Sequence, residues 1–367
     1  MKKIVIVAGA RPNFVKVAPL MRAISSADGV DCRLVYAGSA ADPTLEASLF
    51  NDLQMPRPDV FLGVDSPRLN EITAQVMGRL DRYLDEYPAD VVIVVDDLAS
   101  TMAAAITAKK RGVKVAHLVA GTRSFDITMP KEVNRLVIDA LSDYLFTAGM
   151  KSNSVATREQ QGDTAQTFMV GNILIDTLRF NLPRFQAPTS LDLQPSSYIV
   201  LTLNRRVLLA DEDYLREMLR TVMAAAEGTP VIAPLRPEAY QKVLAALSSL
   251  SSQRVGSSAA STHVLPLNPL PYLEFGWLTA HARGIITDSG NVAEEATFNG
   301  VPCATLNDYA EHQETVTIGT NVLVGSDREK LRQAVADMVH GQWKKAALPD
   351  RWDGRSAERI VQILLTQ

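Results

Sequence analysis

Residues 3–16 read KIVIVAGARPNFVK, and this stretch decides the fold class. Four consecutive β-branched residues, Ile4 to Val7, are typical of a strand buried inside a parallel sheet. Gly9 permits a tight turn after that strand, and Pro12 suits the first turn of a helix. The pattern therefore predicts a strand, a turn and a helix, which together form the first unit of a parallel α/β sheet.

The same alternation of apolar runs and helix-like segments recurs along the chain and is typical of parallel sheets covered by helices. The predicted strands are 4–8, 32–37, 91–95, 114–118, 198–202, 230–234, 284–287 and 303–306. The predicted helices include 12–25, 99–111, 131–141 and 211–227. The fold class that follows is α/β, with parallel sheets. A chain of 367 residues exceeds one ordinary hydrophobic core, so we expect two domains.

A stretch with proline and serine, 181–197, interrupts the alternation and predicts an interdomain connection. We expect a Rossmann-like N-terminal domain over 1–180 and a second Rossmann-like domain over 190–345. The segment 352–367 contains an amphipathic pattern that predicts a C-terminal helix. The small polar residues of 249–262 predict a surface loop.

Composition narrows the classes of function. The formal net charge is −4, which argues against nucleic acid or an anionic membrane surface as a partner. Cys32 and Cys303 form no disulfide framework and no zinc motif, as is typical of a cytoplasmic protein. No ligand-spaced cluster of His and Cys indicates a metal, and no stretch is apolar for long enough to span a bilayer.

Ligands of open α/β sheets bind at the carboxyl ends of the strands, so polar residues that follow strands are the candidates for a site. After the first strand come Arg11 and Lys16, at a helix start. Cationic side chains together with helix N–H groups suit an anion. The alternative interpretation is an ordinary helix start with two solvated cations.

The run DSGN at 288–291 follows another predicted strand. Ser289 suits a helix N-cap, and Gly290 lets a phosphate approach the backbone. Glu294 and Glu295 come next in the same helix. One of these carboxylates can accept both hydroxyls of a ribose, and the alternative role is to complement the helix dipole.

Acidic residues also follow two strands of the first half. Asp96 and Asp97 come directly after 91–95, where either helix capping or acid–base chemistry is a suitable role. Two adjacent carboxylates would repel each other if both were buried, which would raise the pKa of one. A later polar loop carries Asp126 and Glu132, which serve either a site or a helix dipole.

Each motif alone leaves its role open, but several motifs that occur in order along the chain remove this ambiguity. They are Gly9-Ala10-Arg11-Pro12 with Lys16 and Ala18-Pro19-Leu20, Ala120-Gly121-Thr122-Arg123 with Glu132, Asn134 and Arg135, Val170-Gly171-Asn172 with Asp176, Asp288-Ser289-Gly290 with Glu294-Glu295-Ala296, and Gly319-Thr320-Asn321-Val322-Leu323-Val324-Gly325. Through nearly its whole length, the chain resembles the UDP-N-acetylglucosamine 2-epimerase family.

The resemblance implies a glycosyltransferase-B-like fold, with two domains that face a central cleft and a last helix that returns to the first domain. It implies a UDP-sugar ligand, a homodimer, no cofactor and no metal. The implied reaction inverts C2 by eliminating and re-adding UDP. The implied catalytic residues are Asp97, Glu132, Lys16 and Asp126. The implied nucleotide-sugar ligands are Arg11, Asn204, Arg205, Phe275, Ser289, Gly290, Asn291, Glu295, His312 and Glu314. Among them, the backbone near Phe275 would read the uracil.

The chain also departs from the family pattern. Val119 stands where the family has a glutamate, Asn204 where it has a histidine, and Ser39-Ala40 where the allosteric site has Gln-His. A valine cannot transfer a proton, although Asp96 and His312 are extra ionisable groups. Two alternatives therefore stay open beside epimerisation. One is hydrolysis or glycosyl transfer on a nucleotide-sugar, and the other is binding without turnover.

Overall fold

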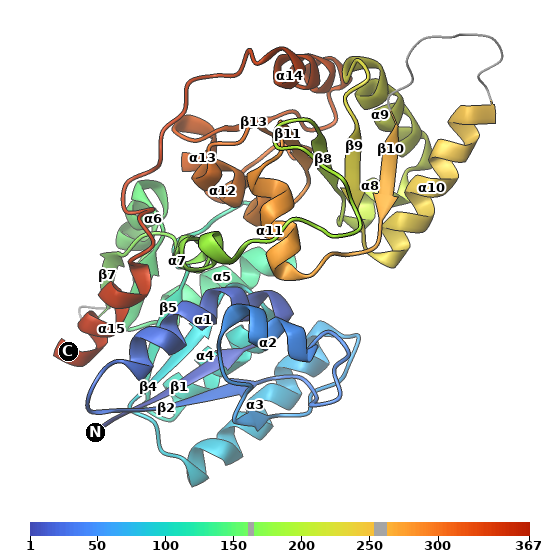
Figure 1. Ribbon diagram of the computed structural model, residues 1–367. Helices are drawn as coiled ribbons and strands as arrows, with labels where there is room; N and C mark the ends of the chain where they lie inside the picture. Colours follow the sequence, from blue (N-terminus) through green and yellow to red (C-terminus); the bar gives the residue numbers. More distant parts are fainter. Residues whose placement is uncertain (161–164, 253–262) are drawn as a thin grey trace. The chain divides into compact units, whose positions relative to one another are not determined.

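The computed structural model describes residues 1–160, 165–252 and 263–367 (Figure 1). The chain divides into two compact units. Unit 1 contains Met1–Phe180 together with Asp350–Gln367, and unit 2 contains Asn181–Pro349.

Unit 1 is built on a seven-stranded parallel sheet in the order β3-β2-β1-β4-β5-β6-β7. Its strands are β1 (Lys2–Ala8), β2 (Val30–Tyr36), β3 (Val60–Phe61), β4 (Val91–Val95), β5 (Lys114–Leu118), β6 (Tyr144–Thr147) and β7 (Gln166–Met169). Its helices are α1 (Arg11–Ser25), α2 (Ala47–Leu53), α3 (Leu69–Glu86), α4 (Ala99–Lys110), α5 (Pro130–Leu141), α6 (Met150–Glu159), α7 (Ile173–Asn181) and α15 (Ser356–Thr366).

Unit 2 is built on a six-stranded parallel sheet in the order β10-β9-β8-β11-β12-β13. Its strands are β8 (Ile199–Thr202), β9 (Val231–Pro234), β10 (Val264–Leu267), β11 (Gly284–Thr287), β12 (Cys303–Thr305) and β13 (Asn321–Leu323). Its helices are α8 (Arg206–Ala210), α9 (Glu212–Ala225), α10 (Pro237–Ser252), α11 (Tyr272–Ala280), α12 (Gly290–Asn299), α13 (Glu314–Thr317) and α14 (Arg328–His340).

Both sheets are doubly wound, and each has one point where the strand order reverses. In unit 1 this switch point lies between β1 and β4, and in unit 2 it lies between β8 and β11. Ligands of such sheets bind at the carboxyl ends of the strands beside the switch point. The turns after β1, β4, β8 and β11 are therefore the positions from which a site is built.

Burial on both faces explains the continuous apolar runs of the strands. In β8, Ile199 and Leu201 belong to one buried cluster, whereas Val200 belongs with Tyr198 to another. Successive side chains of a strand point to opposite faces, so each face of this sheet has its own core beneath the helices.

The α/β class is confirmed, and all eight predicted strands are present with small shifts at their ends. The prediction omitted β3, β6, β7, β10 and β13. These strands contain only two to four residues, and several carry polar side chains, so their apolar pattern is too short to recognise.

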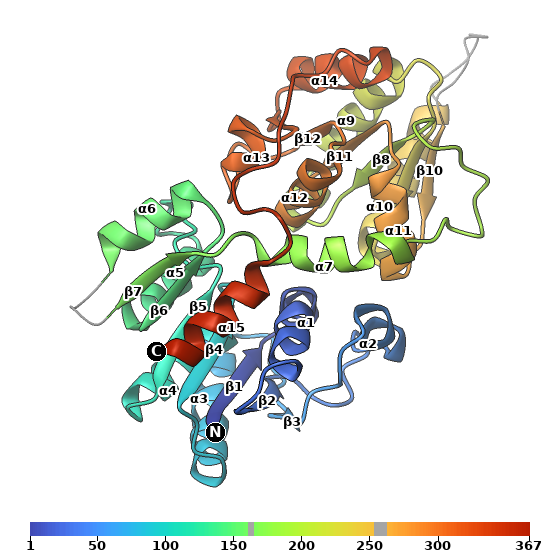
Figure 2. The ribbon, with the colours of Figure 1, turned by 60° about the vertical axis from the view of Figure 1, so that its left-hand side comes forward.

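The end of the chain is part of unit 1. Helix α15, drawn in red, packs against α1, and Figure 2 shows the two side by side. The indole Nε1 of Trp352 donates to the carbonyl oxygen of Ala148 at 3.0 Å, and the side chain is almost fully buried. This contact fastens the segment that precedes α15.

The expected loop at 249–262 and the expected lack of a membrane-spanning stretch can be compared only with the described residues. Residues 249–252 of the predicted loop form the end of α10, and the rest of that loop lies outside the described residues. Within the described ranges, no helix has both the length and the apolar character that crossing a bilayer requires.

Candidate functional site

The turn after β1 is joined to the end of β4 through two side chains of α1. Asn13 accepts the N–H groups of Gly9 and Ala10 on its Oδ1, at 2.8 and 3.1 Å. Its Nδ2 donates to Asp96 Oδ2 at 2.7 Å, and Lys16 Nζ contacts Asp96 Oδ1 at 2.6 Å. These contacts bring two predicted candidates, one from each side of the switch point, into direct contact.

Asp97 is held from the other direction, by α5. Arg135 approaches Asp97 Oδ2 with Nε at 2.9 Å and with Nη2 at 2.7 Å, and Lys131 Nζ lies 3.3 Å from Oδ1. Asn134 donates its Nδ2 to the main-chain oxygen of Asp97. Leu98 is the N-cap of α4, so Asp97 serves a polar site and not a helix cap.

The two adjacent carboxylates face different helices. Asp96 has φ +59°, a left-handed conformation that aspartate tolerates better than most residues. Its carboxylate contacts α1, whereas that of Asp97 contacts α5. Each carboxylate therefore has its own cation, Lys16 for Asp96 and Arg135 for Asp97, which offsets the repulsion expected between adjacent acids.

Glu132 is buried and bound on every side by donors. It accepts the N–H and Oγ of Ser124, each at 2.9 Å, the N–H of Phe125 at 3.2 Å, and Nη1 of Arg135 at 3.3 Å. Burial tends to raise the pKa of Glu132, but these hydrogen bonds outweigh it and lower the pKa below its usual value. Glu132 is thus held as an anion, and its hydrogen bonds fix the backbone of residues 124 and 125.

Asp126 lies on the exposed part of the same loop. Its Oδ1 accepts from Thr128 Oγ1 at 2.6 Å and from the N–H of Thr128 at 3.0 Å. Both hydrogen bonds lower the pKa of Asp126. In this structure the carboxylate organises a local turn, and it does not contact Asp97 or Lys16.

A buried charge network that the sequence analysis did not identify lies beneath these carboxylates. Asp139 Oδ1 is 2.5 Å from Nδ1 of His117, and its Oδ2 contacts Arg123 at 2.7 Å. Burial would raise the pKa of Asp139, but His117 and Arg123 hold it below its usual value. Nε2 of His117 faces the main-chain oxygen of Asp96 at 3.0 Å. The network therefore supports the strand ends that carry the site.

Val119 has a backbone conformation that is unusual for its residue type. It follows β5 with φ +73°, a value that is strained for a β-branched side chain. Strained residues of this kind cluster at functional sites. Val95 pairs with Leu118 in the sheet, and the N–H of Asp96 donates to the oxygen of Leu118 at 3.3 Å. Val119 and Asp96 thus stand at the ends of neighbouring strands.

Arg11 is the first residue of α1 and is partly exposed. Its guanidinium makes no hydrogen bond or ion pair with any other part of the chain that the structure describes. Ala10, the N-cap, has no side chain to cap the helix. The N-terminus of α1 therefore presents a cation and backbone donors that can receive an anion.

At the switch point of unit 2, Asp288 organises the turn after β8. Its Oδ2 accepts the N–H groups of Asn204 and Arg205, both at 2.7 Å. Ser289 occupies the N-cap position of α12 as predicted, but its side chain makes no capping hydrogen bond. This helix start, with Gly290 and Asn291 as its first two residues, is thus placed beside Asn204 and Arg205.

Glu295 lies further along α12 and is buried. Burial first, and then the charge of Glu294, raise the pKa of Glu295 to about 8. Nε2 of His312 lies 3.7 Å from Oε1 of Glu294. Glu314, which begins α13, is also buried, and α13 is in contact with α12.

A cavity of about 40 Å³ lies beside this helix start, lined in part by Arg205, Gly290, Glu311 and His312. It is large enough for water but far too small for a sugar. Phe275 does not line this cavity. It is part of α11, and its N–H donates to the oxygen of Pro271, the N-cap of that helix.

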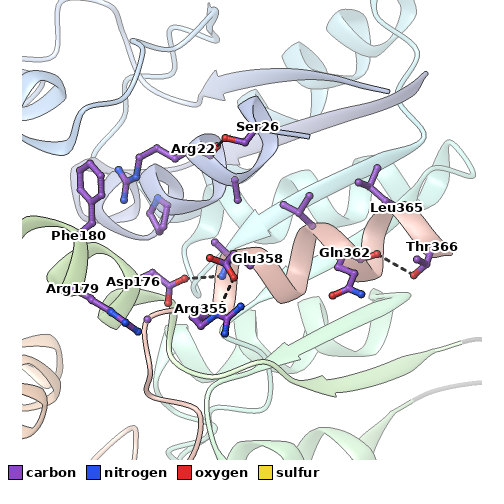
Figure 3. Close-up of a pocket in the computed structure, with 15 residues that line it drawn as sticks. Arg22, Ser26, Asp176, Arg179, Phe180, Arg355, Glu358, Gln362, Leu365 and Thr366 are labelled. Atoms are coloured by element: carbon purple, nitrogen blue, oxygen red, sulfur yellow. Dashed lines mark hydrogen bonds and ion pairs between the residues drawn. The ribbon is translucent and has the colours of Figure 1, made fainter. Parts of the chain in front are cut away.

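A larger groove in unit 1, of about 1160 Å³, carries none of the predicted site residues. It lies between α1, α7 and α15, and its lining includes Arg22, Asp176, Phe180 and Leu365 (Figure 3). Cavity size alone therefore does not locate the candidate site, because the charged groups that converge lie at the ends of the strands.

The geometry defines two candidate sites, one at the switch point of each unit. Unit 1 brings Lys16 into contact with Asp96, next to Asp97, and adds Asn13, which was not predicted. Unit 2 brings together the turn at Asn204 with the start of α12. The sequence signal for Asn13 was its position four residues after Gly9, in the first helical turn.

Comparisons with known proteins give the same class. The profile of the UDP-N-acetylglucosamine 2-epimerase family matches residues 22–365. The chain has the glycosyltransferase-B-like fold, with two α/β units that are each built on a parallel sheet. It belongs to the UDP-N-acetylglucosamine 2-epimerase family.

Individual relatives match through their full length. The UDP-N-acetylglucosamine 2-epimerase of Methanocaldococcus jannaschii is 31% identical over 99% of this chain and 98% of its own. Its crystal structure with UDP-GlcNAc and UDP superposes with a TM-score of 0.85, covering 100% of both chains at 30% identity. The UDP-2,3-diacetamido-2,3-dideoxy-D-glucuronate 2-epimerase of Pseudomonas aeruginosa is 30% identical over 90% of each chain.

Proposed function

We propose that this protein is an isomerase that inverts C2 of a UDP-sugar. The observation that carries the proposal is the pair Asp96 and Asp97, which directly follows β4 at the switch point of unit 1. Carboxylates held by fixed cations beside the anion-binding start of α1 suit proton transfer next to a diphosphate. Membership of the 2-epimerase family supports the same reaction.

Unit 2 is proposed to hold UDP. The start of α12 supplies backbone donors, Arg205 supplies a positive charge, and Gly290 leaves room for a phosphate to approach. Glu295 is proposed to accept the ribose hydroxyls. The remaining predicted ligands, Asn204, Phe275, Ser289, Asn291, His312 and Glu314, are kept as proposals for this nucleotide site.

Unit 1 is proposed to carry the chemistry. A carboxylate, Asp97, removes the C2 proton while the C1–oxygen bond breaks and UDP leaves with the electron pair. A proton then returns to the opposite face of C2, and UDP adds back to C1. The C2 proton is weakly acidic, so stabilisation of the leaving diphosphate by Arg11 and Lys16 is essential.

Glu132 and Asp126 retain different parts in this proposal. Glu132 shapes the loop at 124–125 and orients Arg135, the partner of Asp97. Asp126 lies on the exposed tip of that loop, where a bound sugar could meet it.

The relatives narrow the sugar class. The proteins of M. jannaschii and P. aeruginosa are named for UDP-sugars that share a 2-acetamido group on a gluco-configured ring. We therefore propose a UDP-2-acetamido sugar as substrate of this chain.

A homodimer and a cytoplasmic location complete the proposal. Val133 and Leu136 lie three residues apart on α5 and are both partly exposed apolar residues, which supports a contact surface. Cys32 and Cys303 are both free thiols, which supports a reducing compartment. Sedimentation velocity of the purified chain tests the dimer.

One experiment tests the reaction. The protein is incubated with UDP-N-acetylglucosamine in deuterated water, and C2 is followed by proton NMR. Deuterium at C2 of both epimers, with the UDP linkage intact, is the expected result. Free UDP with a hydrolysed or transferred sugar would replace the proposal by its alternative, and saturable binding without either change would indicate a non-catalytic protein.

A further inference from the structure

Inversion at C2 requires one proton to leave one face of the sugar and another to arrive on the opposite face. Asp97 provides an acid–base group at the end of β4. The end of neighbouring β5 provides Val119, which cannot transfer a proton. The site therefore needs a second acid–base group from another position.

We propose that Asp96, coupled to Lys16, is that second acid–base group, an inference that rests on the proposed function. The side chain of Lys16 is 8% exposed and that of Asp96 is 18% exposed. Asp96 is thus the more open member of the pair, and its Oδ1 lies 2.6 Å from the ammonium of the more buried Lys16. A proton carried by Lys16 reaches the substrate through the carboxylate.

The position of the Asp96 carboxylate is determined by several independent contacts. Asn13 Nδ2 fixes Oδ2, and Lys16 fixes Oδ1. The main-chain oxygen of Asp96 faces Nε2 of His117, which is itself held by Asp139. An acid–base group is effective only when its geometry is fixed in this way.

The backbone conformation of Asp96 directs its carboxylate away from that of Asp97. At φ +59°, Asp96 directs its side chain to α1 while Asp97 directs its own to α5. The two groups are therefore available to different sides of a ligand at the switch point. Asp96 also stands beside Val119, because Val95 and Leu118 pair in the sheet.

In each turnover one proton leaves C2 and one proton arrives, so the two groups together need only one transferable proton. Asp97 takes the C2 proton, the C–H electron pair forms the C1–C2 double bond, and UDP leaves with the C1–oxygen pair. The Lys16–Asp96 pair then gives its proton to the opposite face of C2, and a UDP oxygen forms the new bond to C1. Exchange with water resets both groups, and the reverse reaction exchanges their roles.

Asp96→Gly is the decisive variant, since glycine adopts a positive φ without strain. Asp96→Asn is the second variant, because it keeps the size and an oxygen acceptor for Lys16. Glu227→Gly is the matched control. It also removes an acid at positive φ, +48°, but on the exposed surface of unit 2.

We expect both Asp96 variants to form the C2 epimer at least about 100-fold more slowly. Elimination continues from the epimer whose proton Asp97 removes, so free UDP and an unsaturated C1–C2 sugar accumulate. Affinity for UDP, measured by calorimetry, stays within twofold, and Glu227→Gly behaves as the wild type.

Two results would overturn the inference. One is epimer formation by Asp96→Gly within threefold of the wild type. The other is a parallel loss of elimination and epimer formation in both variants, which would make Asp96 a support for Lys16 only. If the wild type itself places no deuterium at C2, the proposed function fails first and this inference falls with it.

Discussion

The Oδ1 of Asp176 in α7 accepts the N–H of Ala357 in the first turn of α15, at 2.7 Å. One carboxylate thus caps the helix that ends the chain, 181 positions further along. Its other oxygen, Oδ2, is buried and meets no hydrogen-bond donor among the described residues.

The carboxylate of Asp176 makes the free energy of unfolding depend on pH. Burial is the main cause that raises the pKa of Asp176, to about 6 from 3.8. A raised folded-state pKa means that the folded protein keeps the proton longer, so stability falls as pH rises from about 4 to about 6. The shift corresponds to a loss on the order of 3 kcal/mol.

Asp176→Asn should keep the hydrogen bond to Ala357 and remove this pH dependence. We expect its thermal midpoint to exceed that of the wild type above pH 6, measured by calorimetry from pH 4 to 8. Asp81→Asn, in an exposed ion pair with Arg111, serves as the control and should follow the wild type. A midpoint for Asp176→Asn that falls in parallel with the wild type would contradict the assignment.

The affinity for UDP should rise with pH through about 8. Burial and Glu294 raise the pKa of Glu295 to about 8, and ribose hydroxyls donate best to the ionised carboxylate. Binding should then release a proton, seen by calorimetry in buffers of different ionisation enthalpy. Glu295→Gln should lose the pH dependence. Equal UDP affinity of the wild type at pH 7 and 9 would remove Glu295 from the ribose contact.

Val119→Gly should change the free energy of unfolding by no more than about 1 kcal/mol. Relief of the strain of φ +73°, typically about 1–3 kcal/mol, offsets both the lost burial of a half-buried valine side chain and the backbone entropy of glycine. The same change at Val94, fully buried in β4, should cost about 2 kcal/mol or more. Chemical denaturation measures both variants, and destabilisation at both positions alike would argue against strain at Val119.

Asp139→Asn should destabilise unit 1 by about 3–5 kcal/mol, because His117 and Arg123 lose their buried counter-charge. Epimer formation should fall too, since His117 supports the backbone of Asp96. Glu329→Gln removes an exposed pair with Arg332 and should change stability by less than about 1 kcal/mol. Thermal melts that show similar small changes for both variants would refute the role of the network.

Asp97→Asn should reduce kcat by about 100- to 10,000-fold while the fold remains intact. The carboxamide oxygen can still accept from Arg135, and Glu132 remains as a counter-charge for this buried guanidinium, so the protein should still fold but with a thermal midpoint below that of the wild type. Single-turnover NMR of the C2 proton is the measurement. A rate equal to that of the wild type would exclude Asp97 from proton transfer.

Local patterns were enough to predict the long buried strands. The run at β1 and the run at β4 are continuous and apolar because helices cover both faces of the sheet, so burial is visible in the sequence itself. Short strands such as β7 and β13 were missed because pairing with a neighbour, and not their own composition, makes them strands.

The candidate site was predictable to a smaller extent. Polar residues after strands indicated Lys16, Asp97 and the run 288–291, because carboxyl ends of parallel strands meet at one edge. Asn13 gave only a weak signal, its position four residues after Gly9, and Asp139 gave none, since a buried amide or carboxylate in a helix has the same appearance in sequence as a solvated one.

The sequence by itself determined the α/β class, the family and the residue types at the strand ends, because these follow from local periodicity and from ordered motifs. Only the tertiary structure decided which groups meet. That Asp96 is directed to Lys16 and Asp97 to Arg135 depends on one left-handed residue and on helices that follow different strands. Long-range pairing of this kind is set by chain topology, which no local pattern encodes.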